Sequence, residues 1–583
     1  MKARLARLVN TRARKITAIV VVMLLVAGIV LVTWPTPPPT PVASRDVTIT
    51  APGGPGVEDP VELDATLYLP SRTPAPAIIM AHGFGGSKAS VAVDAEQSAR
   101  DGFVVLAYSA RGFGASTGQI GLDSLDYEIP DARAIVGWLA QQPEVQLDGP
   151  GDPRVGVTGG SYGGALALML AGTDPRVDAV VPLITWNDLE QSLFPNAQTT
   201  AADLAAATPA AAEGVDDGVF KKFWTSTLMA SVTTGAALSA SGTAQGDTGD
   251  SNFVRRGSSS GSASSGTDSG SSGLPAGITP DAAAALAGSC GRMMVQLCAG
   301  YAQAAQTGRI GPEFSALLAR SSPKAVVGNI TVPTLLVQGE KDTLFPLSEA
   351  DANARAIAAN GATVAVTWYN GGHDGGSTPD TATQDQISQW FRYYLAGSGP
   401  EPSKAFRYTV DGPISDTGSA RSRTLEVPAY PGLAAGSTTN RVSIPLSGDP
   451  QFVVNPPGAT PASISSLPGV TGLASTALST LAGGLPGQTA RFESAPFDTL
   501  TVLAGTPRIN LSVTRLPIPG TIEQAGAQGA DEGMVLYGSI AKVSAGGTRS
   551  TVGGVAPIRL PEAPADGTPV LVTMSLPAAA LQV

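Results

Sequence analysis

The sequence predicts an α/β domain that carries a helical insertion and is followed by an all-β region. Apolar strands alternate with helices through residues 47–185 and again through 331–397. The chain between these halves, 186–330, is Ala-rich and has no apolar strand pattern. Short strands separated by Gly, Pro and Asp turns fill residues 400–583, which predicts a β-sandwich. A chain of 583 residues is long enough for two or three domains.

The two halves of the α/β domain have the same pattern. Apolar runs bounded by Gly or Pro predict strands at 61–69, 75–82, 103–109, 153–160, 177–184, 332–339 and 363–369. Helical periodicity or strong helix formers predict helices at 126–142, 163–172, 347–360 and 384–396. Strands that alternate with helices form a parallel sheet covered on both faces.

The insertion at 186–330 is predicted to form a helical cap. It contains GSSSGSASSGTDSGSSG at 257–273, a tract that cannot bury enough apolar surface to fold, and we expect it to be disordered. An insertion between two halves of one sheet lies over the carboxyl ends of the strands, where open α/β sheets bind ligands. The cap therefore covers the expected site.

The N-terminus has the pattern of a membrane anchor. Residues 1–15 carry six cations and no acid, and residues 16–33 are uncharged and long enough to span most of a bilayer. Because the cations precede the apolar segment, we expect a cytoplasmic tail and an exported body, with the Pro-rich stretch 34–46 as a stiff linker. A signal peptide cleaved near Val42-Ala43-Ser44 is the alternative, and the protein would then be secreted.

Composition excludes several classes of function. The formal net charge is −11 despite the basic N-terminus, which argues against a nucleic-acid partner. Two cysteines, Cys290 and Cys298, are too few for a metal-finger framework.

On one straight helix these two cysteines would lie about 12 Å apart, too far for a disulfide, but Gly288 and Gly291 could break the helix. A disulfide and two unpaired thiols both remain open.

The stretch VTGGSYGGA, residues 157–165, contains the pattern G-x-S-x-G of a nucleophile elbow. The same pattern surrounds Ser116 and Ser259, so the pattern alone decides little in a chain with 69 glycines. Only Ser161 follows a predicted buried strand and precedes a predicted helix, which is the context that the elbow requires. We therefore predict that Ser161 is the nucleophile.

A serine nucleophile needs a base, which is normally histidine, and the chain has only His82 and His373. His373 lies in GGHDGG just past a predicted strand and is the better base. The carboxylate that orients it is predicted to be Asp342, in the loop of VQGEKDTLFP, with Glu340 as a nearby rival. Ser, Asp and His in this order along the chain are typical of the α/β-hydrolase fold.

The oxyanion hole is predicted to consist of backbone N–H groups. One comes from Tyr162, the residue after the nucleophile, and another from Gly83 or Phe84 in the loop HGFGG. Two donors aimed at the tetrahedral oxyanion contribute roughly 3 kcal/mol each. Arg111, in SARGFGAS, is expected to hold loops together.

With these residues the chain resembles the peptidase S15 family of Xaa-Pro dipeptidyl peptidases and cocaine-esterase-like (CocE/NonD) hydrolases. DGFVVLAYSARGFGASTG, DYEIPDARAIVGWL, GGSYGG and GGHDGG carry the resemblance. It implies an α/β-hydrolase with a helical cap and a C-terminal jelly-roll-like sandwich that cleaves esters or amides through an acyl-enzyme, with no metal or cofactor. Family members often have a tyrosine where this chain has Phe84.

Three functional hypotheses follow. The first is an extracytoplasmic, membrane-tethered serine esterase acting on a small-molecule ester. The second is an Xaa-Pro dipeptidyl-peptidase or aminopeptidase, for which Asp188 and Glu190 could bind a free amino group of the peptide. The third is a non-catalytic envelope protein that uses the sandwich for binding. An intact triad favours the first two, and the sequence indicates neither the acyl group nor the oligomeric state.

Overall fold

The computed structural model describes residues 41–197, 218–233, 290–411, 422–433, 441–454, 487–514, 534–547, 549–560 and 567–583. The apolar segment 16–33, most of the linker 34–46 and the Gly/Ser tract 257–273 lie outside these residues. Among the helices that the structure describes, none combines the length and the apolar character needed to cross a bilayer.

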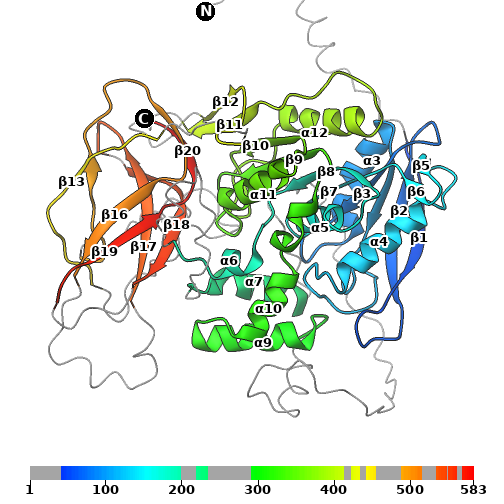
Figure 1. Ribbon diagram of the computed structural model, residues 1–583, viewed down its shortest axis with the longest axis horizontal. Helices are drawn as coiled ribbons and strands as arrows, with labels where there is room; N and C mark the ends of the chain where they lie inside the picture. The colour runs from blue at the N-terminus through cyan, green and yellow to red at the C-terminus, as the bar shows by residue number, and fades with distance from the viewer. Residues whose placement is uncertain are drawn as a thin grey trace, which may run out of the picture. The chain divides into compact units, whose positions relative to one another are not determined.

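A twelve-stranded mixed sheet forms the framework of the described chain (Figure 1). Its spatial order begins with β1 (Ala43–Ala51), β2 (Val61–Leu69), β4 (Val104–Tyr108), β3 (Ala77–Ala81), β7 (Val155–Gly160), β8 (Val177–Leu183), β9 (Thr334–Gly339) and β10 (Val364–Tyr369). It continues through β11 (Phe406–Asp411), β20 (Ala579–Gln582) and β15 (Val502–Gly505), with β12 (Ser422–Val427) on β11. From β4 to β11 all neighbours are parallel.

Helices cover the parallel strands, as the sequence predicts. These helices are α3 (Ala92–Arg100), α4 (Glu128–Leu139), α5 (Tyr162–Ala171), α11 (Leu347–Ala359) and α12 (Thr381–Tyr394). Strands β3 and β4, with sequences AIIMA and VVLAY, are buried at every residue. Burial on both faces is why these strands are continuous apolar runs rather than alternating ones. The predicted α/β fold class is confirmed.

Strand β1 begins at Ala43, inside the segment that we assigned to the linker. It pairs antiparallel with β2 at the edge of the sheet and alternates between exposed and more buried residues. An edge strand of this kind has one solvated face, so its polar positions weaken the apolar signal on which the prediction relied. A small hairpin of β5 (Leu147–Gly149) and β6 (Asp152–Pro153) precedes β7.

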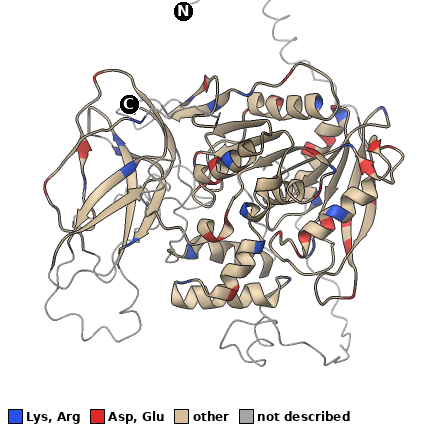
Figure 2. Ribbon diagram, in the orientation of Figure 1, with Lys and Arg blue, Asp and Glu red and all other residues tan. Residues whose placement is uncertain are grey.

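The described part of the insertion is built mainly from helices. It contains α6 (Leu189–Leu193), α7 (Lys222–Thr233), α9 (Val295–Thr307) and α10 (Pro312–Arg320), which lie together at the bottom of Figure 1. Helix α9 carries no charged residue and α7 carries only Lys222, so Figure 2 draws both almost entirely in tan. Helices with so little charge bury apolar surface against one another and against the α/β domain.

The C-terminal region is rich in β-strands, and part of it extends the main sheet. Strand β11 follows the predicted domain boundary near residue 400 and nevertheless pairs in parallel with β10. The other strands form antiparallel pairs: β13 (Leu446–Ser447) with β14 (Glu493–Ser494), β16 (Arg508–Val513) with β19 (Val570–Ser575), and β17 (Val535–Val543) with β18 (Arg549–Arg559). Of the stretch RVSIPL, residues 441–446, only Leu446 lies in a strand, β13.

Candidate active site

Ser161 lies at a sharp turn between β7 and α5. Its backbone has φ 57° and ψ −115°, a left-handed conformation that a non-glycine residue adopts only under strain. The turn also needs small residues, because a Cβ on Gly163 would come within 2.3 Å of the Ala81 carbonyl oxygen of β3. These are the features of a nucleophile elbow, which presents its hydroxyl above the sheet.

His373 lies on the loop after β10, and its Nε2 is 2.9 Å from the Oγ atom of Ser161. The preceding residue, Gly372, has φ 147°, and a Cβ there would be 2.7 Å from the Cβ of Asp342. Only glycine allows the two loops to approach this closely. The loop after β10 therefore holds the imidazole against the Ser161 hydroxyl.

Asp342 lies on the loop after β9, and its Oδ2 is 2.6 Å from Nδ1 of His373. The carboxylate also accepts a hydrogen bond from the backbone N–H of Phe345 at 2.8 Å, which fixes its orientation. The rival Glu340 instead accepts from the backbone N–H of Thr409 on β11. The structure thus brings Ser161, His373 and Asp342 into one hydrogen-bonded chain and directs Glu340 elsewhere.

The charges around His373 keep it basic. Burial lowers its pKa, but the charge and hydrogen bond of Asp342 and the charge of Asp374 outweigh burial and raise the pKa above its ordinary value. His82 has the opposite environment: burial lowers its pKa to about 4. Its Nε2 accepts from the Ala110 N–H at 3.0 Å and its Nδ1 faces the Gly83 carbonyl at 2.7 Å. His82 is therefore a neutral residue that shapes the HGFGG loop.

The predicted oxyanion donors surround the nucleophile. Tyr162 is the first residue of α5, so its N–H has no acceptor within the helix and points out of the N-terminus. A Cβ on Gly83 would be 3.8 Å from the Cβ of Ser161, which places the HGFGG backbone beside the hydroxyl. The ring of Phe84 packs edge-on against Tyr162. The oxyanion role of these three residues stays a prediction.

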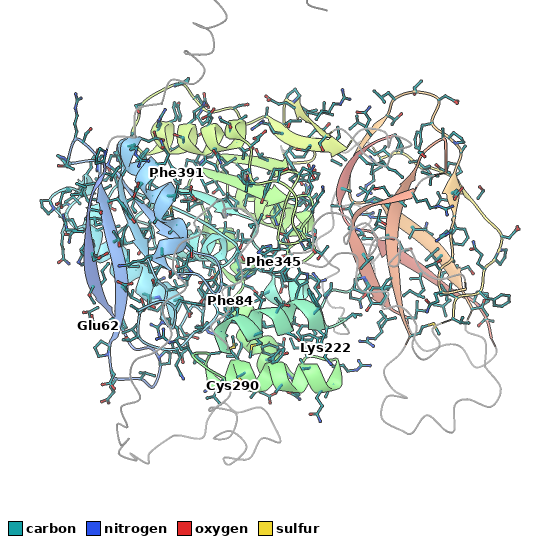
Figure 3. All side chains as sticks on the ribbon, turned by 180° about the vertical axis from the view of Figure 1, so that it is seen from behind. Glu62, Phe84, Lys222, Cys290, Phe345 and Phe391 are labelled. Carbon is teal, nitrogen blue, oxygen red and sulfur yellow. A yellow bond between two sulfur atoms is a disulfide. The ribbon has the colours of Figure 1, made fainter. Side chains whose placement is uncertain are left out.

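An apolar cavity opens beside Ser161. Its volume is about 60 Å³, measured as the space open to the centres of water-sized spheres. Phe84 and Phe345 line it from the catalytic domain, and Figure 3 labels both next to the cap helices. Leu122, Tyr162 and Leu344 of the α/β domain also line it, and the insertion contributes Trp186, Leu189, Leu193, Thr225, Leu228, Met229, Met293, Leu297, Tyr301 and Phe314. None of the cavity-lining residues carries a charge.

Comparison with known proteins identifies the family. The model of the X-Pro dipeptidyl-peptidase (S15) family matches residues 59–373, which is more than half of the chain. The chain belongs to the S15 family. Its whole-chain fold is similar to a CocE/NonD family hydrolase from Staphylococcus aureus, with a TM-score of 0.51 and 12% identity over 94% of this chain and 89% of that one.

Two curated relatives match shorter segments of this S15-family chain. The quorum-quenching protein AidA of Acinetobacter baumannii is 32% identical over 145 residues, which are 24% of this chain and 46% of that protein. An uncharacterized 31.7 kDa protein from Escherichia coli, encoded in the traX-finO intergenic region, is 28% identical over 114 residues, 19% of this chain and 38% of that one. The match spans less than half the length of either relative.

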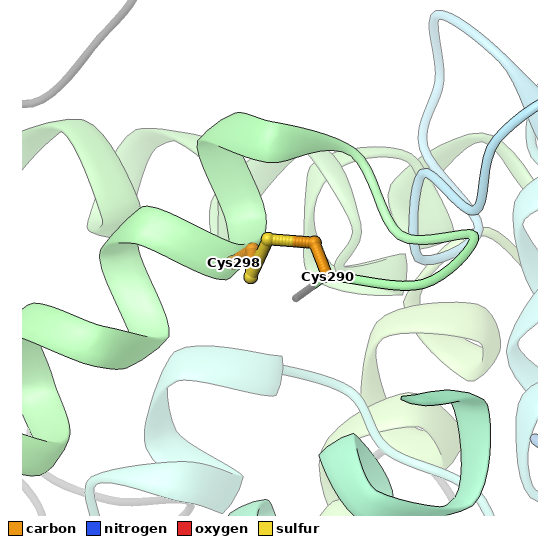
Figure 4. Close-up of a disulfide and its surroundings, with 2 residues drawn as sticks. All are labelled: Cys290 and Cys298. Atoms are coloured by element: carbon orange, nitrogen blue, oxygen red, sulfur yellow. A yellow bond between two sulfur atoms is a disulfide. The ribbon is translucent and has the colours of Figure 1, made fainter. Parts of the chain in front are cut away.

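The cap of this S15-family chain contains a disulfide between Cys290 and Cys298 (Figure 4). Helix α9 begins only at Val295, so Cys290 lies in the turn before it rather than on the same helix. Gly291, with φ 58°, helps to form that turn. The Cα atoms are consequently 5.9 Å apart, within the range for a disulfide, and not at the spacing of one straight helix.

The other candidate residues that the structure describes are hydrogen-bonded to neighbouring groups and do not line the cavity. Ser116 donates to the Ser109 carbonyl at 2.7 Å and accepts from the Asp64 N–H at 2.9 Å, whereas Ser259 lies outside the described residues. Asp188 accepts from the Gln191 N–H at the start of α6 and from Lys324. Glu190 accepts from the Ser315 hydroxyl of α10 at 2.5 Å. Neither acid lines the cavity.

Sequence reasoning missed four residues around the hydrogen-bonded pair of Asp342 and His373: Lys221, Trp224, Thr343 and Asp374. They lie beside the Asp342–His373 pair but not in its hydrogen-bonded chain. The position of Asp374 directly after His373 was a signal available in the sequence; the two cap residues had none. Among the described residues, no group of three or more His, Cys, Asp or Glu side chains could hold a metal ion.

Proposed function

We propose that this S15-family hydrolase is a serine esterase that cleaves carboxylic esters through an acyl-enzyme. The hydrogen-bonded chain Ser161–His373–Asp342 beside an apolar cavity is the observation that carries the proposal. In the first step Oγ of Ser161 attacks the ester carbonyl while Nε2 of His373 takes its proton. The alcohol leaves with that proton, and a water activated by the same imidazole then hydrolyses the acyl-enzyme.

The surroundings support each of these roles. Asp342 accepts the hydrogen bond from Nδ1, which leaves Nε2 free of its proton and able to act as base. The same carboxylate stabilises the imidazolium that forms in the transition state. The N–H of Tyr162, at the positive end of α5, would stabilise the oxyanion together with a backbone donor of the HGFGG loop.

The apolar cavity favours an ester with a short apolar acyl group. A volume of about 60 Å³ is several times the minimum that holds one water, so the cavity has room for a small group and not for a long chain. A peptidase that reads a free amino terminus needs a polar or charged group in its pocket. Asp188 and Glu190, the candidates for that role, are held by Lys324 and Ser315 outside the cavity. Peptide cleavage is therefore the second candidate.

We further propose that the enzyme works outside the cytoplasm. Two features support this location: the basic residues 1–15 before the apolar segment 16–33, and the disulfide in the cap, a bond that is rare in reducing compartments. Protease treatment of intact cells that express the chain tests it. A body digested only after the cells are lysed contradicts the proposal.

The first experiment compares the full chain with its Ser161→Ala variant. p-Nitrophenyl butyrate reports ester cleavage and Ala-Pro-p-nitroanilide reports dipeptidyl-peptidase activity. We expect ester turnover that falls by about 10⁴- to 10⁶-fold in the variant, with little anilide turnover. Strong anilide turnover would instead favour the peptidase. Equal turnover by both proteins, or absence of fluorophosphonate labelling of Ser161, would exclude serine catalysis at this elbow.

A further inference from the structure

The cap touches the catalytic loops at a lysine. Lys221 directly precedes helix α7, and its Nζ donates to the carbonyl oxygens of Thr343 at 2.6 Å and Leu344 at 3.1 Å. Both carbonyls belong to the loop that carries Asp342. An ammonium group that donates to two adjacent carbonyls restrains the path of that backbone.

The first turn of α7 makes a second contact with the same loop. Trp224 donates from its indole Nε1 to the Oγ1 of Thr343 at 3.0 Å. That hydroxyl in turn donates to Oδ1 of Asp374 at 2.7 Å, and the Thr343 N–H donates to Oδ2 at 2.5 Å. Asp374 follows His373 directly in the chain. Thr343 therefore joins the loop that carries Asp342 to the loop that carries His373, and α7 holds Thr343.

Aromatic contacts restrain the imidazole itself. The ring of His373 meets the ring of Trp224 edge-to-face, with centroids 6.1 Å apart, and that of Phe345 at 5.2 Å. Trp224 thus contacts both the base and the residue that orients the two loops. Neither Lys221 nor Trp224 is hydrogen-bonded to Ser161 or lines the cavity, so neither is placed to contact an acyl group bound there.

We propose that Lys221 and Trp224 are positioning residues, through which the cap holds Asp342 and His373 in line with Ser161. The inference rests on the proposed serine hydrolysis. A hydrogen bond to a loop that carries a reacting group gains its catalytic value from geometry, because a displacement of about 1 Å at the reacting groups can cost about 100-fold in rate. The cap would then be part of the catalytic apparatus as well as the wall of the acyl cavity.

The charges of this network also predict a pH signature. Three ionisable groups act on His373: Asp342 and Asp374 raise its pKa, and Lys221 lowers it. Lys221 itself has its pKa lowered to about 8 by burial, while Glu349, Asp342 and Asp374 favour its charged form. Loss of the Lys221 charge should move the acid limb of kcat/KM to higher pH. Loss of the Asp374 charge should move it to lower pH.

The test compares Lys221→Met, Trp224→Phe and Asp374→Asn in the full chain with p-nitrophenyl butyrate. Lys221→Met keeps an unbranched side chain without the charge, and Trp224→Phe keeps a ring without the N–H. The exposed neighbour Lys222 supplies the matched control, Lys222→Met. We expect kcat to fall about 10- to 100-fold in Lys221→Met, with little change in KM. The acid limb of kcat/KM should move to higher pH in Lys221→Met and to lower pH in Asp374→Asn.

A purely structural anchor would give a different result. If Lys221→Met lowers the unfolding temperature while its kcat and its acid limb match those of Lys222→Met, the proposal is wrong. If Lys221→Met does not fold, Trp224→Phe decides: a kcat several-fold below that of the parent at unchanged KM supports positioning, and a parental kcat overturns it. Failure of the proposed function is seen separately, as equal turnover by the parent and Ser161→Ala.

Discussion

The imidazole Nε2 of His373 lies 2.9 Å from the Ser161 hydroxyl although 212 residues separate them in the chain. The sheet creates this contact. Ser161 directly follows β7 and His373 follows β10, and the strands between them, β8 and β9, run parallel to both. Because the carboxyl ends of parallel strands share one edge, loops from distant segments meet there.

The raised pKa of His373 predicts how activity depends on pH. The imidazole must be neutral to accept the Ser161 proton, so kcat/KM should fall as the pH drops through a pKa above the ordinary value of 6.5. Asp342→Asn removes a charge that raises this pKa, and should move the acid limb to lower pH while kcat falls about 10⁴-fold. A pH–rate profile from about pH 5 to 9 measures both. An acid limb that Asp342→Asn leaves in place would contradict the assignment of His373 as base.

The cavity predicts a limit on acyl length. Leu297 of α9 is buried and lines the cavity, so Leu297→Phe should fill part of it. We expect turnover of p-nitrophenyl butyrate to fall by at least about tenfold, since overpacking costs about 1–3 kcal/mol, while the acetate ester is still cleaved. Leu297→Ala should extend the accepted chain length. Equal effects on acetate and butyrate would show that the acyl group binds elsewhere.

The disulfide predicts a stability contribution that depends on redox conditions. It closes a loop of only eight residues, for which chain entropy gives about 2–3 kcal/mol. The paired variant Cys290→Ser/Cys298→Ser should unfold more readily in denaturant by about this free energy. The parent should approach the variant when dithiothreitol is added, and the variant should not respond. If dithiothreitol reduces the disulfide of the unfolded parent and yet leaves its free energy of unfolding unchanged, the expectation is wrong.

We expect the buried side chain of Arg111 to contribute to the free energy of unfolding and not directly to catalysis. Its buried guanidinium donates twice to Asp131, at 2.7 and 2.6 Å, and also to the carbonyls of Gly53 and Pro52. Arg111→Met leaves a buried carboxylate without its cation, so we expect a loss of about 3–5 kcal/mol in the free energy of unfolding. Urea titration measures the loss. The double variant Arg111→Met/Asp131→Leu should recover part of it, because it removes the uncompensated charge.

Much of the fold could be predicted because its signals are local. Val104–Tyr108 and Val155–Gly160 are apolar runs that parallel strands require on both faces. The edge strand that begins at Ala43 had a weaker signal, because half of its residues face solvent. The pairing of β11 with β10 was not predictable either, since strand partners depend on contacts between segments and not on the pattern within one.

The sequence by itself determined where Ser161 must lie, because a nucleophile elbow needs a strand, small neighbours and a helix, all within a few residues. It also limited the base to two histidines. Only the tertiary structure decided that Asp342 faces His373 while Glu340 faces β11, and that Lys221 and Trp224 of the cap reach the catalytic loops. The physical reason is that a side chain's partner depends on how whole elements pack, and spacing along one segment does not record that packing.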